Sequence, residues 1–298
     1  MDENVPLKNK CTYHIGGEAR YFATPGSLDE LEQLLDDCKK SETPWFLLGA
    51  GSNVLFSDDG FSGVVIRLAG AFKEIVFDDA AERVVAGGAA RLPYLSRTCA
   101  KRGIGGFEFL CDIPGTVGAA VRINAGTREH EIKDRLLSVK VLDPEEGVRT
   151  LTAEELQLGY RRSMLLERRW IVLEAHFSYG CRASRAALLE AMAAERRARK
   201  AKQPANPRNC GSVFKGAERP AGWYIEQCGL KGCRIGGAMI AEEHANWIVN
   251  VGDATAADVK ALIELAQSSV YERFGVMLQR EVEYVDVGAS RETPRSAG

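Results

Sequence analysis

The clearest periodic pattern in the chain lies in residues 28–40, LDELEQLLDDCKK, where leucines recur at the spacing of one helix face. Ser27 precedes this segment, and Glu30 follows three residues later, which is the arrangement of a capping box. The pattern therefore predicts a helix that begins directly after Ser27. Thr152 and Glu155 form a second capping box, the usual sign of a helix start, ahead of the segment LQLGYRRS.

Short apolar runs bounded by turn residues predict strands through the first two thirds of the chain. These runs are 45–48, 54–68, 72–78, 83–90 and 170–179, with a hairpin expected over 136–151. Residues 91–103 are expected to be helical, and the small residues after the Pro114-Gly115 turn signal are expected to open a short helix.

The last third of the chain follows a strong predicted helix over 183–202, whose cations gather at its C-terminal end and suit the helix dipole. The segment QPANPRN (203–209) breaks the pattern and predicts the main domain boundary. Beyond it we expect a helix around 220–228, a strand at 247–251, a helix after Thr255 and a strand over 280–287. Residues 288–298 are polar and are expected to form a disordered tail.

Composition limits the possible functions more than it identifies one. A chain of 298 residues exceeds the usual size of one core, so two or three units are expected. A net charge of −2 provides no strong field for nucleic acid or an anionic membrane. No apolar run is long enough to span a membrane, and the N-terminus lacks a signal-peptide pattern. The eight cysteines are scattered, without zinc spacing, so we expect reduced, mostly buried thiols, no metal site and a cytoplasmic location.

The glycine-rich segment GAGSN (49–53) follows an apolar strand and is the first candidate for chemistry. Glycines allow backbone N–H groups to converge on an oxygen-rich group such as a pyrophosphate. The segment matches neither the P-loop nor the dinucleotide fingerprint. Because it leads into another strand, it does not favour a Rossmann unit, and a plain hairpin turn fits about as well.

A second glycine-rich segment, DIPGTVGAAVRINAG (112–126), places Gly115, Thr116, Val117 and Gly118 at a predicted helix start. Their N–H groups would suit a second phosphate edge or a flat ring, although tight helix-to-sheet packing explains the small residues equally well. Two such loops in one lobe fit a long ligand with a diphosphate, and FAD is such a ligand.

Three further segments, GYRRS (159–163), NCGSVFK (209–215) and LQREVEYV (278–285), carry polar residues that each have a simple structural explanation. Taken in order with the others, however, they resemble the UDP-N-acetylenolpyruvoylglucosamine reductase family. The resemblance extends from residue 12 to residue 285, and the short stretch after Lys215 resembles the shorter of the family's two architectural types. Its most specific motifs are GAGSNVLF (49–56), IPGTVGAAV with NAG (113–126), YRRS (160–163), CGSVFK (210–215), AGWYIEQCGLKGCRIGGA (221–238) and HANWIVN (244–250).

The resemblance implies an α+β fold with a two-lobed FAD-binding domain of the vanillyl-alcohol-oxidase-like type and a smaller α/β substrate domain. On this chain the expected segments are 1–70 for the first lobe, 71–202 for the second, and 203–287 for the substrate domain with a returning strand. The cofactor residues implied by the resemblance are Gly49, Ala50, Gly51, Ser52, Asn53, Val54, Pro114, Gly115, Thr116, Val117, Gly118 and Asn124. The implied substrate residues are Tyr160, Lys215 and Lys231.

The implied reaction reduces UDP-N-acetylglucosamine enolpyruvate to UDP-N-acetylmuramate in peptidoglycan precursor synthesis, with hydride passing from NADPH through FAD to C3. By resemblance, Arg161 holds the substrate carboxylate, Ser212 gives a proton to C2, and Glu281 donates to the developing enediolate. No nucleic acid, membrane or obligate protein partner is implied. Two stretches depart from the family pattern: Gly216-Ala217 replaces the usual Asn-Pro, and residues 127–130 replace Ala-Tyr-Gly.

Two other functions remain compatible with the sequence. One is an alcohol-oxidising flavoprotein of the same superfamily, although the chain offers no obvious His or Cys for covalent flavin attachment. The other is a binding protein that keeps the scaffold without catalysis. The presence of Arg161, Ser212 and Glu281 together favours the reductase over both.

Overall fold

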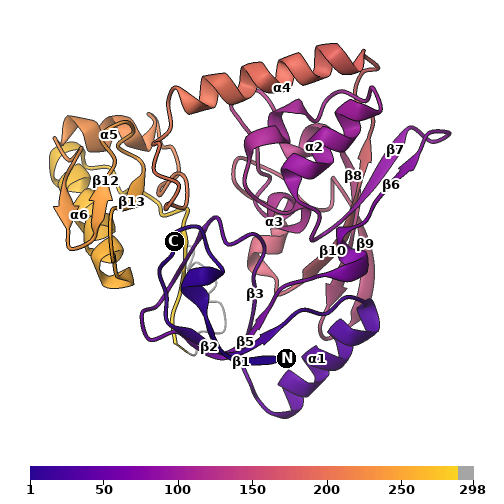
Figure 1. The fold of residues 1–298 in the computed structure, drawn as a ribbon, viewed down its shortest axis with the longest axis horizontal. Helices are drawn as coiled ribbons and strands as arrows, with labels where there is room; N and C mark the ends of the chain where they lie inside the picture. The colour runs from indigo at the N-terminus through magenta and orange to yellow at the C-terminus, as the bar shows by residue number, and fades with distance from the viewer. Residues whose placement is uncertain (288–298) are drawn as a thin grey trace. The chain divides into compact units, whose positions relative to one another are not determined.

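The computed structural model describes residues 1–287, and these residues form two compact units. Figure 1 colours the chain by residue number from the N-terminus to the C-terminus. The first unit comprises Met1–Phe22, Gly51–Val65 and the chain from Arg199 to the end of the described residues. The second comprises Ala23–Ala50 and Ile66–Ala198. The units are therefore interleaved along the chain, and the division into the segments 1–70, 71–202 and 203–287 stays a prediction. The predicted tail, 288–298, lies outside the described residues.

The N-terminal strands and the C-terminal strand belong to the same unit. Strands β1 (Asp2–Pro6), β2 (Glu18–Ala23) and β5 (Phe61–Ile66) are neighbours in one sheet. Strand β4 (Val54–Phe56) pairs in parallel with β14 (Glu283–Val285), with Glu283 opposite Val54. This parallel pair brings residues 283–285 to the residues that directly follow GAGSN.

The rest of the first unit is a small α/β module. Its sheet has the order β11 (Arg234–Ile235), β12 (Ala238–Ile240) and β13 (Ile248–Asn250). Helix α6 (Ala256–Phe274) packs against β11 and β12, and helix α5 (Ala221–Gln227) packs against α6. Thr255 and Asp258 form a capping box at the start of α6, and Gly275 ends the helix in the left-handed conformation.

The second unit is built on a five-stranded antiparallel sheet. Its order is β6 (Ile75–Asp78), β7 (Arg83–Gly87), β10 (Ile171–Ser178), β8 (Leu136–Asp143) and β9 (Gly147–Thr152). Helices α2 (Leu92–Lys101) and α3 (Val117–Arg122) contribute buried side chains to the same core as β8 and β10. The unit also contains α1 (Leu28–Lys40), β3 (Trp45–Leu47) and most of α4 (Arg185–Lys200). The last two residues of α4 belong to the first unit.

Most predicted elements are confirmed with boundaries shifted by a few residues. Ser27 Oγ accepts a hydrogen bond from Glu30 N at 3.3 Å, so α1 begins where its capping box predicted. The Thr152–Glu155 box also forms, but a turn follows instead of a helix, since Gln157 has a φ of 50°. Short 3₁₀ helices occupy Leu7–Asn9, Gly70–Lys73, Glu108–Asp112, Ile132–Asp134 and Met164–Glu167.

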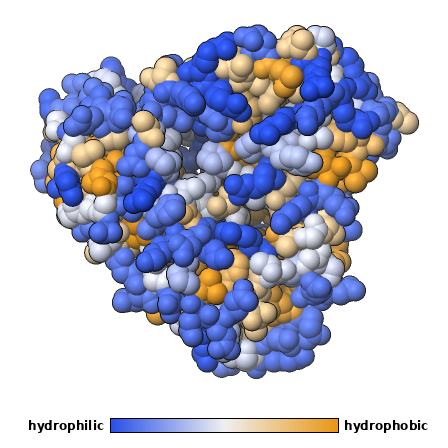
Figure 2. Space-filling view, in the orientation of Figure 1, coloured by the Kyte–Doolittle hydropathy of each residue, from blue (hydrophilic) through white to orange (hydrophobic). Residues whose placement is uncertain are grey.

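The surface agrees with the composition. Figure 2 shows hydrophilic residues over most of the visible face, with hydrophobic residues in small separate groups. Within residues 1–287, no helix has the length and apolar character needed to cross a bilayer. Five of the eight cysteines are buried, and all eight are free thiols.

Candidate functional site

The loop GAGSN connects β3 to β4 and keeps several backbone donors available. The N–H groups of Gly49, Ala50, Gly51 and Asn53 donate to no acceptor among residues 1–287. Gly51 has a φ of 73°, and a Cβ there would lie 2.3 Å from Lys10 O, so only glycine fits. A run of unused N–H groups on a glycine-rich turn is the arrangement that binds phosphate oxygens.

The second glycine-rich segment lies against the first. A Cβ at Gly49 would lie 3.1 Å from Thr116 Oγ1 and 3.5 Å from Ala119 Cβ. Gly49 therefore leaves room where α3 begins, and it brings two loops that are far apart in the sequence into contact. This juxtaposition fits a single extended ligand, as the two patterns suggested.

The backbone of α3 corrects one part of that prediction. Val117 N donates to Ala90 O at 2.9 Å, and Gly118 N donates to Gly88 O at 2.8 Å. These two N–H groups join the start of α3 to the residues that directly follow β7, and they are not available to a phosphate. Since Pro114 has no N–H, the remaining donors of the motif are Gly115 N and Thr116 N, which have no acceptor within the described chain.

Asn124, which was predicted to contact the cofactor, makes its hydrogen bonds within the protein. Its side chain is fully buried, and Nδ2 donates to Gly159 O at 2.9 Å and to Glu131 Oε2 at 3.0 Å. Its Oδ1 accepts from Lys133 N at 3.0 Å. The protein itself uses the amide and leaves no exposed surface for a cofactor, so Asn124 positions the turn that begins at Gly159.

That turn carries Arg161. Gly159 and Arg162 exchange backbone hydrogen bonds of 3.0 and 3.1 Å, which leaves Tyr160 and Arg161 at the tip. Arg161 has a φ of 52°, a conformation that costs a non-glycine residue free energy and that clusters at functional sites. Arg161 Nη2 donates to Gly126 O at 2.9 Å, while Tyr160 is 60% exposed.

Ser163, the last residue of YRRS, stabilises the turn through its own hydrogen bonds. Ser163 is completely buried, and its Oγ donates to Arg122 O at 2.5 Å and accepts from Leu165 N at 3.2 Å. The Arg122 guanidinium donates to Leu165 O, to Leu166 O at 3.2 Å and to Arg168 O at 3.1 Å. The conformation of Arg161 is thus held by residues on both sides of the motif.

In the first unit, the structure brings Ser212 and Glu281 close along two neighbouring backbone segments. Glu281 N donates to Val213 O at 2.8 Å, and Lys215 N donates to Gln279 O at 2.9 Å. Both Ser212 and Glu281 are half-buried. Asn53 fixes the same segment, because its Nδ2 donates to Glu281 O at 3.1 Å and its O accepts from Glu283 N at 3.1 Å.

Hydrogen bonds also connect the residues before Ser212, in part through Thr12, to the glycine-rich loop and the strand that follows it. Thr12 N donates to Gly51 O at 2.8 Å, while Thr12 Oγ1 donates to Asn209 O at 2.5 Å. Cys210 is buried and donates to Val54 O at 3.2 Å. Burial raises the pKa of the Cys210 thiol far above its usual range, so it remains protonated and serves packing instead of nucleophilic chemistry.

The other predicted residues are less constrained. Lys215 is half-buried, and Lys231 Nζ lies 2.9 Å from Glu226 Oε1 on the surface. Ser212 and Glu281 belong to the first unit and Arg161 belongs to the second.

The sequence did not predict the hydrogen bonds of Thr12 and Asn246, or the contact of Asn53 with Glu281. Side-chain bonds to distant backbone groups leave no spacing signal in a sequence.

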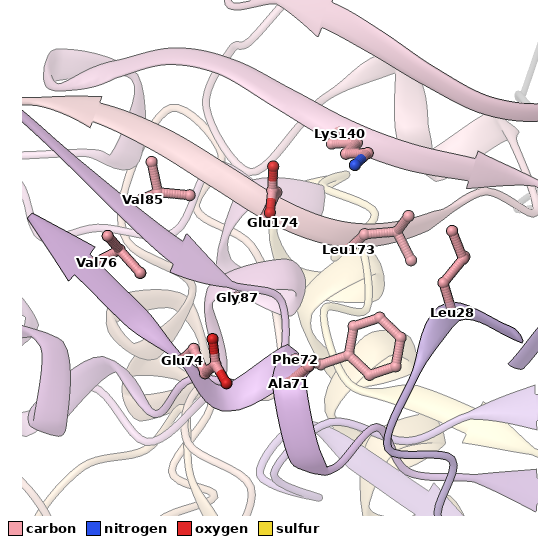
Figure 3. Close-up of a pocket in the computed structure, with 10 residues that line it drawn as sticks. All are labelled: Leu28, Ala71, Phe72, Glu74, Val76, Val85, Gly87, Lys140, Leu173 and Glu174. Carbon is pink, nitrogen blue, oxygen red and sulfur yellow. The ribbon is translucent and has the colours of Figure 1, made fainter. Parts of the chain in front are cut away.

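A pocket of about 190 Å³ lies elsewhere, on the outer face of the second unit's sheet. Figure 3 shows Leu28, Phe72 and Leu173 gathered at one end of it. Glu174 and Lys140 stand opposite each other on β10 and β8, on the face away from the core residues Ala175 and Phe177. None of the predicted site residues lines this pocket.

Comparison with known proteins matches both parts of the chain. Residues 19–152 match the family described as an FAD binding domain, and residues 203–285 match the C-terminal domain of UDP-N-acetylenolpyruvoylglucosamine reductase. A protein named UDP-N-acetylenolpyruvoylglucosamine reductase from Caldanaerobacter subterraneus subsp. tengcongensis is 40% identical over 286 residues, covering 95% of this chain and 92% of that protein. One of the same name from a Synechococcus strain is 40% identical over 283 residues, covering 95% and 90%.

A solved structure is similar over almost the same length. The crystal structure of UDP-N-acetylenolpyruvylglucosamine reductase from Thermus caldophilus has a TM-score of 0.77 and 37% identity, covering 93% of this chain and 96% of that chain. The predicted α+β fold, with an FAD-binding domain and a separate C-terminal domain, is confirmed.

Proposed function

The chain belongs to the UDP-N-acetylenolpyruvoylglucosamine reductase family, and we propose that it reduces UDP-N-acetylglucosamine enolpyruvate to UDP-N-acetylmuramate with NADPH as the reductant. It is an FAD-dependent oxidoreductase. We place the reaction in the cytoplasm, in peptidoglycan precursor synthesis. The observation that supports the proposal best is the backbone bond of 2.8 Å from Glu281 N to Val213 O, which holds the residues Ser212 and Glu281 on adjacent segments.

The cofactor residues suit FAD by their donors. The diphosphate would bind at the unused N–H groups of Gly49, Ala50, Gly51 and Asn53, with Ser52 and Val54 completing the loop and Gly115 and Thr116 beside it. Bound FAD supplies the hydride that is delivered to C3 of the enolpyruvyl ether.

The protein residues supply charge stabilisation and a proton. Hydride addition at C3 leaves negative charge at C2, delocalised into the neighbouring carboxylate. The guanidinium of Arg161 would fork onto that carboxylate, since its planar donors match two oxygens. The Ser212 hydroxyl would protonate C2, while Glu281 would donate to the enediolate and Lys215, Tyr160 and Lys231 would hold the anionic substrate.

The test is anaerobic rapid mixing of the reduced holoenzyme with UDP-N-acetylglucosamine enolpyruvate, followed by flavin absorbance. Wild-type protein should be reduced by NADPH and rapidly reoxidised by the substrate. Ser212→Ala should be reduced at the wild-type rate but reoxidise about 10²–10³-fold more slowly, a loss of about 2.7–4 kcal/mol. A wild-type flavin that this substrate never reoxidises would refute the proposal and favour an alcohol oxidase or a binding protein.

A further inference from the structure

We propose that Asn246 is a positioning residue for the proton transfer, because it fixes the backbone that carries Ser212. This inference rests on the function proposed above. Asn246 lies in HANWIVN, after β12, and bonds to the two residues that directly follow Ser212.

Asn246 takes three of the four backbone polar groups of Val213 and Phe214. Val213 N donates to Asn246 O at 2.9 Å, and Phe214 N donates to Asn246 Oδ1 at 3.0 Å. Asn246 Nδ2 donates to Phe214 O at 2.9 Å. The fourth group, Val213 O, accepts from Glu281 N at 2.8 Å. The segment after Ser212 is therefore fixed between Asn246 on one side and the segment of Glu281 on the other.

Water cannot replace these bonds. The exposed fractions of Val213, Phe214 and Asn246 are 1%, 2% and 6%. Loss of the Asn246 amide would leave the buried peptide groups of Phe214 without partners, and the segment would have to move to satisfy them. Movement of this segment would displace the Ser212 hydroxyl, and misplacement by about 1 Å can cost about 10²-fold in rate.

The turn that presents Asn246 is itself well defined. Asn246 N donates to His244 Nδ1 at 3.2 Å, and Trp247 N donates to His244 O at 3.0 Å. A Cβ at Gly222, in α5, would lie 3.4 Å from both Asn246 Cβ and Asn246 N. Asn246 thus has little freedom to follow a displaced segment.

The chemistry of an amide gives a specific test. Phe214 needs an acceptor and a donor from one side chain, which an amide provides and an ionised carboxylate does not. In Asn246→Asp, the ionised group repels Phe214 O, but the protonated acid restores both bonds. Burial beside a carbonyl should raise the pKa of the introduced carboxyl above the reference value of about 3.9.

The experiment measures reoxidation of NADPH-reduced holoenzyme by UDP-N-acetylglucosamine enolpyruvate from about pH 8 to about pH 5.5. We expect Asn246→Asp to reoxidise at least about tenfold more slowly than wild type at the upper pH. It should then recover toward the wild-type rate as the pH falls, while Asn246→Ala stays slow throughout. Reduction by NADPH should be unchanged in all variants.

The controls separate positioning from general loss of stability and from other titrating groups. Asp58→Asn weakens a helix cap in the same unit without touching residues 212–214 and should reoxidise like wild type. The titratable groups packed near this turn are His244, with Glu226 and Lys231 beside it, and Glu281 across Val213. These groups are the same in every variant, so only the pH response that is specific to Asn246→Asp reports the introduced carboxyl.

Each result has one meaning. A wild type that the substrate never reoxidises refutes the proposed function. A normal wild type with Asn246→Asp equally fast at the upper pH, or slow without recovery like Asn246→Ala, overturns the positioning role. If Asn246→Asp fails to bind flavin, Asn246→Ser is tested in its place. This variant keeps the hydrogen bond from Val213 N to the backbone O of residue 246. Reoxidation of this variant at the wild-type rate would also overturn the inference, and slow reoxidation with normal reduction by NADPH would support it.

Discussion

Substitution of Asp58 should weaken the start of α6, which lies far from it in the sequence. The Asp58 carboxylate accepts from Ala256 N at 2.8 Å and from Ala257 N at 3.1 Å. The local cap, Thr255 Oγ1, reaches only Asp258 N, at 3.0 Å. Asp58 therefore satisfies the two first-turn donors that the capping box of α6 leaves open.

The expected loss follows from these two bonds. Removing a side-chain cap typically costs about 1 kcal/mol, and the loss of a negative charge at a helix N-terminus costs a further ~0.3–1 kcal/mol. We therefore expect Asp58→Ala to lower the free energy of unfolding by about 1–2 kcal/mol. Asp58→Asn keeps one acceptor and should lose about half as much.

Urea unfolding of the holoenzyme, followed by far-ultraviolet circular dichroism, measures this difference. Asp59→Ala is the matched control, because Asp59 is the next exposed carboxylate in the same loop. If Asp58→Ala and Asp59→Ala unfold within about 0.3 kcal/mol of each other, the carboxylate does not cap α6 and the reasoning is refuted.

Three other substitutions test separate parts of the structure. Arg161→Lys keeps the charge but loses the planar guanidinium, so kcat/KM for the enolpyruvyl substrate should fall by about 10²-fold or more, while reduction by NADPH is unchanged. An unchanged kcat/KM would show that Arg161 does not bind the substrate carboxylate. Asn124→Ala removes a buried amide, so it should lower the free energy of unfolding by about 1–3 kcal/mol with little effect on flavin affinity. Weaker flavin binding at unchanged stability would show instead that Asn124 contacts the cofactor. Burial and then the hydrogen bond to Asp79 raise the pKa of Tyr179 to about 12, above the ordinary value of 10.0. Because the folded state favours the protonated phenol, this stability is complete below about pH 10 and is lost as the pH rises toward about 12. Tyr179→Phe should therefore lose less stability than wild type between about pH 10 and about pH 12 in thermal unfolding, and identical pH dependence would contradict this assignment.

The sequence determined the local features of this protein and the order of its motifs. Ser27 and Glu30 mark the start of α1 because a helix cap depends on residues three apart. GAGSN can be read as a turn with available donors because glycine at Gly51 is a local conformational requirement. The same local rules do not predict a backbone N–H whose acceptor lies far away in the sequence. Val117 N donates to Ala90 O and Gly118 N donates to Gly88 O, so neither group is free for a phosphate.

Only the tertiary structure decided which of these segments meet. The pairing of β14 with β4 brings Glu281 to Asn53, and the bond to Val213 O brings it to Ser212, across separations that no periodic pattern records. Asn246 belongs to a recognisable motif, yet its hold on Phe214 depends on a turn folded against a different segment. Caps and turns are set by neighbours in the chain, whereas buried peptide groups take whichever partner the packed core places beside them.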